Sequence, residues 1–179
     1  MAQTEFSDAI ALLKADHRKV EELFDLFERA RAADRKQALV RQICNELKIH
    51  TMIEEEIFYP ALRGKIEDDT LDEAFVEHDG AKMLVNDLEA GNPDDDYYDA
   101  KVRVLSEEIK HHVNEEEKRG SGMFAQARNS DVDLSALCAE MLVRKSELMA
   151  QADTEGGLPP AVPRAVQAAS ATRGASRRA

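Results

Sequence analysis

The sequence predicts an all-α fold: an antiparallel up-down-up-down four-helix bundle with a short fifth helix. Apolar residues recur with helical spacing through four long segments and one shorter one. Gly and Pro are few and mostly fall between these segments, and short connections make neighbouring helices antiparallel. Residues 1–150 are expected to form the bundle with its accessory helix. Residues 151–179, rich in Ala, Pro and Arg and without periodicity, are expected to be a disordered tail.

The first two helices have clear start and stop signals. Ser7 or Asp8 is a suitable cap for a first helix that runs to about residue 32. Asp34 caps a second helix that runs to about residue 63 and stops at Gly64. Pro60 predicts a frayed or kinked last turn there, because proline cannot donate the backbone hydrogen bond.

The remaining helices are marked in the same way. The acids at 68 and 69 start a third helix, which ends at Gly91. Pro93 and the two aspartates after it are expected to open a fourth, which the glycines at 120 and 122 stop. A shorter fifth helix is expected over 131–149, with apolar positions that fit against the bundle.

A His-x-x-x-Glu pair is the most informative motif of the chain. His50 and Glu54 project from one face of the second helix, and that face is otherwise apolar. The fourth helix repeats the pair as His112 and Glu116, while a single histidine lies in each of the other two long helices, His17 and His78. Because an imidazole or carboxylate is costly to bury without a partner, these side chains are expected to serve one another or a metal.

Chain order places the four histidines at one height. In two antiparallel helices, residues at the same level lie equally far from the turn between them. The midpoints between successive histidines fall between Ala33 and Asp34, at Gly64 and at Asp95, all in or beside expected turns. For a single histidine, an ordinary hydrogen-bonded core position would be the default interpretation. Four at one level favour a metal site.

Four imidazoles and two glutamates are enough for two metal ions. If Glu54 and Glu116 both bridge, each metal receives two imidazoles, two carboxylate oxygens and an oxo or hydroxo bridge, which leaves a sixth position open. Nitrogen and oxygen donors without thiolate favour two iron ions, Fe²⁺ or Fe³⁺, with manganese and zinc as alternatives.

The neighbours of this set are assigned by their helical faces. His111 lies on a polar face and is expected in solvent or supporting the ligands from behind. Tyr59 is expected to be a packing residue. Lys82 either extends to solvent or hydrogen-bonds near the metals. The acids beside the motifs are expected on the exposed side: Glu55, Glu56, Glu115 and Glu117.

These motifs together resemble the hemerythrin-like HHE cation-binding domains. A histidine in the first helix, His-x-x-x-Glu before Phe-Tyr-Pro, Glu-His, and His-His-Val-x-Glu-Glu-Glu carry the resemblance, over about residues 8–128. It implies a non-haem di-iron centre in an antiparallel bundle. The implied ligands are His17, His50, Glu54, His78, His112 and Glu116. Members of the family are associated with oxygen transport, oxygen or nitric oxide sensing, iron homeostasis and peroxide handling.

Departures from the oxygen carriers narrow this range. Carriers have two histidines four apart on the third helix, but Ala74 and Lys82 flank His78 at that spacing. Glu116 stands where carriers have aspartate, and the chain after residue 117 lacks the Phe-Pro closure common in related domains. The resemblance therefore implies an iron protein that responds to O₂, NO or peroxide, by sensing, peroxide decomposition or iron homeostasis, rather than a carrier.

Other functions are less well supported. Ferritin-like oxidases use Glu-x-x-His, and none of the four histidines of the candidate set has a glutamate three residues before it. Glu108 and His111 have this spacing, but His111 lies on the polar face. A metal-free or other-metal helical interaction module is the remaining alternative. The expected partners are a small diatomic ligand or peroxide. A net charge of −12 argues against sequence-independent nucleic-acid binding. Without a CxxC motif, a signal-like N-terminus or a long apolar run, the chain is expected to be cytoplasmic and away from membranes.

Overall fold

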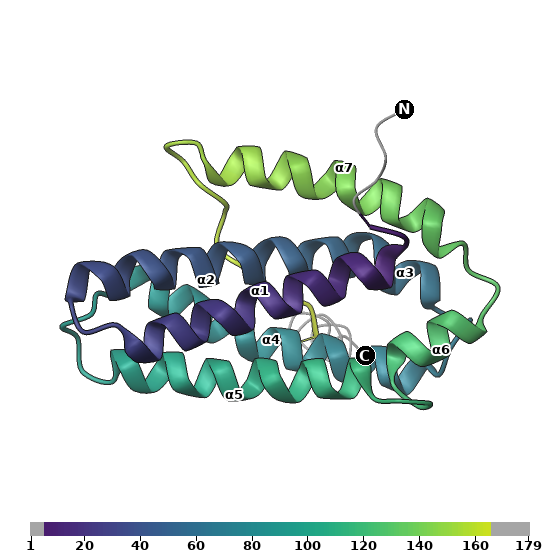
Figure 1. The fold of residues 1–179 in the computed structure, drawn as a ribbon, viewed down its shortest axis with the longest axis horizontal. Helices are drawn as coiled ribbons and strands as arrows, with labels where there is room; N and C mark the ends of the chain where they lie inside the picture. Colours follow the sequence, from purple (N-terminus) through teal and green to yellow (C-terminus); the bar gives the residue numbers. More distant parts are fainter. Residues whose placement is uncertain (1–5, 166–179) are drawn as a thin grey trace, which may run out of the picture.

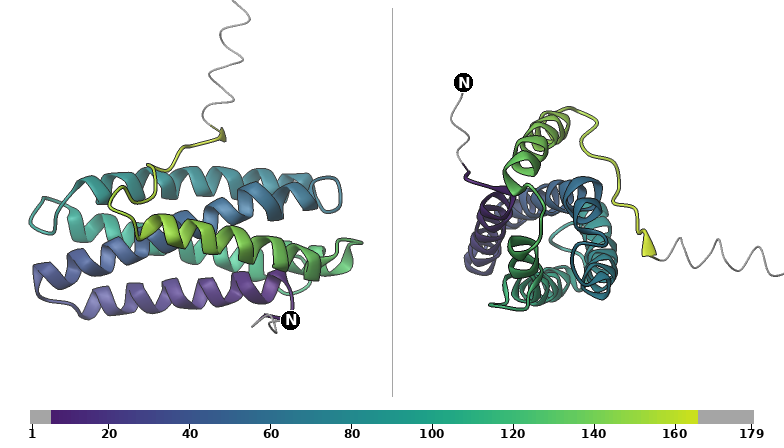
Figure 2. Two further views of the ribbon diagram at one scale, coloured as in Figure 1. Left: turned by 90° about the horizontal axis from the view of Figure 1, so that it is seen from above. Right: turned by 90° about the vertical axis from the view of Figure 1, so that its right-hand side faces the viewer.

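Four long helices form an antiparallel bundle. They are α1 (Ala9–Arg29), α2 (Ala33–Ile53), α4 (Asp68–Ala90) and α5 (Tyr98–Glu117), and they run side by side in Figures 1 and 2. The structure, a computed structural model, describes residues 6–165, and this part of the chain contains helices and no strand. The predicted fold class is confirmed. No helix within these described residues is long and apolar enough to cross a membrane.

The start of α1 agrees with its sequence signal, since the Asp8 carboxylate accepts a hydrogen bond of 2.9 Å from the backbone N–H of Ala11. The end of the second predicted helix is different. Instead of fraying, α2 continues through a π-helical turn, η1 (Glu54–Phe58), into a last short helix, α3 (Tyr59–Leu62). The wider turn suits a proline at residue 60, because its missing N–H is accommodated where the hydrogen-bond pattern changes.

The fourth helix begins later than the sequence predicts. The segment around Pro93 forms a turn in which the Asp95 carboxylate accepts a hydrogen bond from the Asn92 backbone N–H, at 2.8 Å. Tyr97 then takes a left-handed conformation with φ of 67°, and α5 starts at the next residue. Asn92 Oδ1 in turn accepts from the Asp94 backbone N–H at 3.1 Å, which forms an Asx turn. Such turns compete with helix formation, which explains why the acids after Pro93 do not open α5.

Two helices lie outside the four-helix core. The first, α6 (Met123–Asn129), closes one end of the bundle and was not predicted. The other, α7 (Leu134–Ala152), is the predicted fifth helix and lies across α1 and α2 (Figure 1). Asp133 caps α7 by accepting from the N–H groups of Ser135 and Ala136.

The predicted tail divides into two parts. Residues 166–179 lie outside the described residues. Residues 153–165 leave α7, return over α2 and α4, and hydrogen-bond to both (Figure 2). Disorder was therefore wrong for this part, because its backbone pairs with buried side chains although its sequence has no periodicity. The domain boundary at residue 150 stays a prediction.

Buried apolar side chains form two clusters along the bundle. On α1, Leu13 belongs to one cluster and Val20 to the other, with His17 between them. On α4, Ala74 and Ala81 flank His78 in the same way. A buried polar layer therefore separates the two apolar parts of the core.

Candidate metal centre

The four predicted histidines meet in the polar layer. Nε2 of His17 lies 3.2 Å from Nε2 of His50, and Nε2 of His78 lies 3.2 Å from Nε2 of His112. All four side chains are buried. The structure thus brings the imidazoles to one level, as chain order predicted, and arranges them in two pairs.

Glu54 lies between the two pairs. Its Oε2 is 3.2 Å from His50 Nε2 on its own helix and 3.3 Å from His78 Nε2 on α4. Its side chain has no exposed surface. Burial alone would raise the pKa of Glu54, but the positive charge of His50 and hydrogen bonds from both imidazoles hold it well below the usual value.

Glu116 is placed in the same way on the other side. Its Oε2 lies 3.3 Å from His17 Nε2 and 3.7 Å from His112 Nε2. Within the described residues, neither this Oε2 nor Oε1 of Glu54 makes a hydrogen bond, although both are buried. Buried carboxylate oxygens without a hydrogen-bond partner are costly in a metal-free protein and are suited to a cation.

Tyr59 also reaches the layer. Its hydroxyl donates to Glu116 Oε1 at 3.1 Å and lies 3.2 Å from Glu54 Oε2 and 3.3 Å from His78 Nε2. The π-helical turn makes this possible, because the Tyr59 N–H bonds to the Glu54 carbonyl and both residues share one face. Burial and the two glutamates raise the pKa of Tyr59 well above its usual value. Its assignment as a packing residue missed this hydroxyl.

Each imidazole directs its other nitrogen, Nδ1, toward a carboxylate. Three pairs are within hydrogen-bond distance: His17 with Glu117 at 2.8 Å, His78 with Glu55 at 3.0 Å, and His112 with Glu77 at 2.8 Å. His50 Nδ1 lies 3.6 Å from Asp16 Oδ2, close enough for an ion pair but not for a hydrogen bond. A carboxylate on Nδ1 fixes the ring orientation, favours the proton on that nitrogen and leaves the Nε2 lone pair for a metal. The carboxylates therefore stand where they could support metal-binding histidines.

The expectation that all the neighbouring acids are exposed was wrong for Glu55, which is 4% exposed, and for Glu117, whose side chain is only 20% exposed. A sequence signal for the four acids exists. Each of these acids is next in the sequence to one of the six candidate ligands, as Glu55 is next to Glu54. Its carboxylate, however, contacts a histidine on a neighbouring helix, as Glu55 contacts His78. A helix rotates about 100° per residue, so such a neighbour faces the adjacent helix.

Basic side chains stand behind these acids. Lys145 of α7 pairs with Asp16, and Arg18 of α1 lies 2.7 Å from Glu117. Lys82 Nζ lies 2.7 Å from Glu55 Oε1 and is buried, which decides between its two predicted roles in favour of the hydrogen bond near the site.

His111 lies at the edge of the site. Its side chain is 68% exposed, and its Nε2 is 3.3 Å from Glu77, the acid that holds His112. This agrees with its assignment to solvent or to a supporting position. Beside it, a cavity of about 200 Å³ between α4 and α5 is lined by acids including Glu73 and Glu115, and reaches His112 and Glu116.

In the metal-free protein, the carboxylates of the layer stabilise the protonated form of the imidazoles. Burial would lower the pKa of His50, but Glu54 and Asp16 outweigh it and raise the pKa to about 10. The pKa of His78 rises to about 9 through Glu54 and Glu55, again against burial. A metal cation at the same Nε2 atoms would replace these protons.

The donor set fits metal binding. The potential ligand atoms form two groups, and within each group all the atoms lie within 4.8 Å of one another. Glu54 belongs to both groups. The groups are His17, His50, Glu54 and Glu116, and Glu54, His78 and His112. All six predicted residues are thus brought together, and the described cysteines, Cys44 and Cys138, are outside these groups. That the six are ligands stays a prediction.

Comparison with known proteins gives three findings. The family model of the hemerythrin HHE cation binding domain matches residues 8–120. A DNA nickase from Nostoc sp. (strain PCC 7120) is 29% identical over 119 residues, 66% of this chain and 33% of that protein. The chain thus spans about a third of that curated relative. A hemerythrin HHE cation binding domain-containing protein from Mycobacterium kansasii has a similar fold in its crystal structure. Its TM-score is 0.67 at 22% identity, covering 83% of this chain and 94% of that one.

Proposed function

Since the chain belongs to the hemerythrin HHE cation-binding domain family, we propose that it holds two iron ions in the polar layer and responds there to O₂, NO or peroxide. The family and the buried histidine and glutamate groups support metal binding. Iron, the number of ions and the response are the proposal. The ions would be held by His17, His50, Glu54, His78, His112 and Glu116.

One observation carries the proposal: each glutamate contacts one histidine of each pair. Glu54 Oε2 lies at nearly equal distances, 3.2 and 3.3 Å, from His50 and His78. A carboxylate between two pairs of imidazoles is the arrangement needed to bridge two metals about 3.5–4 Å apart. A single metal would require only one of the pairs.

The donor chemistry supports iron. Imidazole and carboxylate donors without thiolate suit iron, while manganese and zinc remain the alternatives for the experiment to exclude. Four Nδ1 carboxylates increase the basicity of the imidazoles, which stabilises the higher oxidation state of a redox metal. When bound, the metal pair would supply electrons for binding or reducing a small oxidant.

The protein's own groups would orient ligands and control protons. Tyr59 holds its proton between Glu54 and Glu116, so its hydroxyl lies within the layer. The carriers have a second histidine four residues from the one that His78 resembles, whereas Ala74 and Lys82 stand at that spacing here. The Tyr59 hydroxyl lies 3.3 Å from His78 Nε2. The absence of that second histidine and the presence of a hydroxyl support a reactive or sensing site over reversible oxygen carriage.

The DNA-nicking activity named for the Nostoc relative is not part of the proposal. This chain matches only about a third of that protein, and its net charge of −12 is unfavourable for binding the phosphate backbone. We also propose a cytoplasmic setting, in keeping with the unpaired buried thiols of Cys44 and Cys138.

Metal analysis of freshly purified protein tests the proposal directly. We expect about two iron ions per chain, and near-UV absorption that changes on addition of O₂, NO or peroxide. A colourless protein whose melting temperature is unaffected by chelator would instead support the metal-free interaction module. One zinc or manganese ion per chain would refute the di-iron assignment.

A further inference from the structure

The segment 158–165, which we call the C-terminal strap, is fixed across the groove between α2 and α4. Asn86 of α4 binds its backbone in both directions, with Nδ2 donating to the Ala161 carbonyl and Oδ1 accepting from the Ala161 N–H, both at 2.8 Å. Lys48 of α2 donates to the Leu158 carbonyl at 3.2 Å. The strap is therefore attached to both helices that it crosses.

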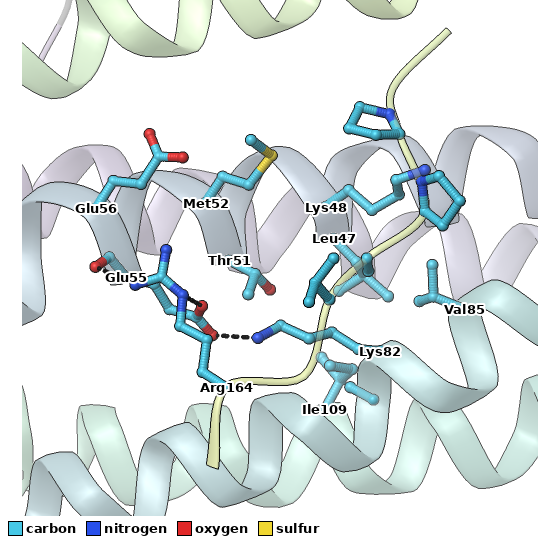
Figure 3. A pocket seen from close by; sticks show the side chains of 15 residues that line it. Leu47, Lys48, Thr51, Met52, Glu55, Glu56, Lys82, Val85, Ile109 and Arg164 are labelled. Carbon is cyan, nitrogen blue, oxygen red and sulfur yellow. Dashed lines mark hydrogen bonds and ion pairs between the residues drawn. The ribbon is translucent and has the colours of Figure 1, made fainter. Parts of the chain in front are cut away.

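The far end of the strap is attached to two buried acids. Asp79 accepts from the backbone N–H of Arg164 at 2.8 Å and from that of Ala165 at 2.7 Å. The Arg164 guanidinium lies 2.9 Å from Oε2 of Glu55 (Figure 3). The other oxygen of Glu55 lies 3.0 Å from Nδ1 of His78. The strap thus ends directly behind the candidate metal centre.

A pocket of about 170 Å³ lies between the strap and the two helices. We call it the strap pocket; Figure 3 shows the side chains around it. Leu47, Val85 and Ile109 line its floor, and Pro159 and Pro160 of the strap line its outer side. At one end the charged side chains pair with one another, as Glu55 does with Lys82 and Arg164. Most of the remaining lining is apolar, although Lys48 and Thr51 also border the pocket and it is partly open to solvent.

Only a thin wall separates the strap pocket from the histidines. A small cavity of about 20 Å³ is bordered by His17, His50, His78 and His112. Leu47, Thr51 and Ile109 line this inner cavity and the strap pocket alike. Motion of these three side chains would join the two cavities.

The chemistry of the pocket selects its occupant. An apolar cavity of about 150 Å³ stays dry and binds xenon or other small apolar molecules. Hydrogen peroxide and anions would have to give up hydrogen bonds to water on entering. The apolar floor does not replace these bonds, and the charged side chains of the lining already pair with other groups, as Lys48 does with Glu89 and Lys82 and Arg164 do with Glu55. A small neutral diatomic gas loses little on entry.

We propose that the strap pocket binds a small apolar gas, O₂ or NO, and passes it to the centre through the wall of Leu47, Thr51 and Ile109. This rests on the proposed function and narrows it, because it makes a gas rather than peroxide the ligand that enters on this side. The polar cavity between α4 and α5, which Thr70 lines, is then the route for hydrated species.

A xenon experiment tests the pocket without any metal. Crystals of the full chain, pressurised with xenon, should show a xenon atom between the strap and Leu47, Val85 and Ile109. Thr51→Phe fills the wall, and Ala81→Leu fills the pocket from α4. Both should displace xenon. An ordered water at that place, or no xenon, would overturn the proposal.

The rate of NO binding to the reduced, iron-loaded protein tests the route. Thr51→Phe and Ala81→Leu should each lower the rate constant about tenfold, which corresponds to about 1.4 kcal/mol of added barrier. The same substitution in the polar cavity, Thr70→Phe, is the matched control and should leave NO binding unchanged. Thr51→Phe and Ala81→Leu should leave the rate of oxidation by peroxide unchanged. Thr70→Phe should lower that rate, because it fills the polar cavity.

The results separate this inference from the function that it depends on. Slower NO binding in Thr70→Phe, with unchanged rates in the two strap-pocket variants, would overturn the route. Thr51 is next to His50 in the sequence, so Thr51→Phe could also lose the metal. In that case the NO-binding rate of Ala81→Leu, on the opposite helix, tests the route. Iron with no bound xenon refutes the pocket alone. Xenon in a protein that takes up no iron supports the pocket and refutes the di-iron function.

Discussion

Glu55 offers the sharpest test of the candidate centre, because it is not a proposed ligand. Its Oε1 lies 3.0 Å from His78 Nδ1 and 2.7 Å from Lys82 Nζ, and its Oε2 lies 2.9 Å from Arg164 Nε. Glu55→Gln keeps the shape of the side chain and an oxygen that accepts from His78, but removes the negative charge. The adjacent Glu56, which pairs with Arg144 at 2.7 Å and contacts no histidine that the structure describes, provides the matched control Glu56→Gln.

The expected magnitudes follow from these contacts. Loss of a carboxylate behind a metal-ligating histidine weakens metal binding about 10–100-fold, which is about 1.4–2.7 kcal/mol. The metal-free protein should also lose about 1–3 kcal/mol of its free energy of unfolding. That loss stays below the value for an isolated buried charge, since Lys82 keeps Asp79 at 3.2 Å. Glu56 and Arg144 are about one-third exposed, so their pair contributes about 0–1 kcal/mol.

Two measurements check this prediction. Competition with a chelator gives the iron affinity of each variant, and urea denaturation of the metal-free proteins gives the free energy of unfolding. Glu55→Gln should have both a lower iron affinity and a lower free energy of unfolding than Glu56→Gln. If the two variants bind iron with equal affinity, the carboxylate does not act on His78 and the centre has been assigned wrongly.

Four further outcomes are expected. His50→Ala should abolish the near-UV charge-transfer absorption and lower the iron content; iron near the wild-type level would contradict this ligand set. Since the pKa values of His50 and His78 are raised to about 10 and about 9, the folded metal-free protein retains protons that the unfolded chain releases above about pH 6.5. Its melting temperature should therefore fall as pH rises from about 6.5 to 10, and iron loading at pH 7 should release protons to an indicator dye; a flat profile would refute both. Tyr59→Phe should keep its iron but lose about 1–3 kcal/mol of unfolding free energy in urea, because a buried hydrogen bond to the glutamates is removed. Deletion of 156–179 should leave the metal content unchanged, since every proposed ligand precedes the strap; loss of metal would show that the strap is needed to hold the site.

The helices and the level of the site were readable from local signals. Apolar residues on one face dictate which side of each helix is buried, and short turns leave antiparallel packing as the simple solution. Equal distances from the turns then bring His17 and His50 to one height, and their Nε2 atoms lie 3.2 Å apart. No long-range information is needed for this step.

The structure differs from the sequence-based prediction where a side chain or a change in helix type alters the backbone hydrogen bonds. Asp95 bonds to the Asn92 N–H and delays α5, and the π-helical turn before Pro60 rotates Tyr59 into the polar layer. A helical wheel with 3.6 residues per turn assigns Tyr59 to the wrong neighbours, because one extra residue in a turn shifts every later position.

The sequence by itself determined which residues are costly to bury and at what height they lie: an imidazole or carboxylate on an apolar face needs a partner, and the chain holds six such residues in four helices. Only the tertiary structure decided what stands behind them. Whether Glu55 meets His78 or water depends on the rotation of α2 against α4, and whether Arg164 reaches Glu55 depends on a strap without periodicity that follows the groove between them. Contacts between distant segments depend on packing angles, which no local pattern encodes.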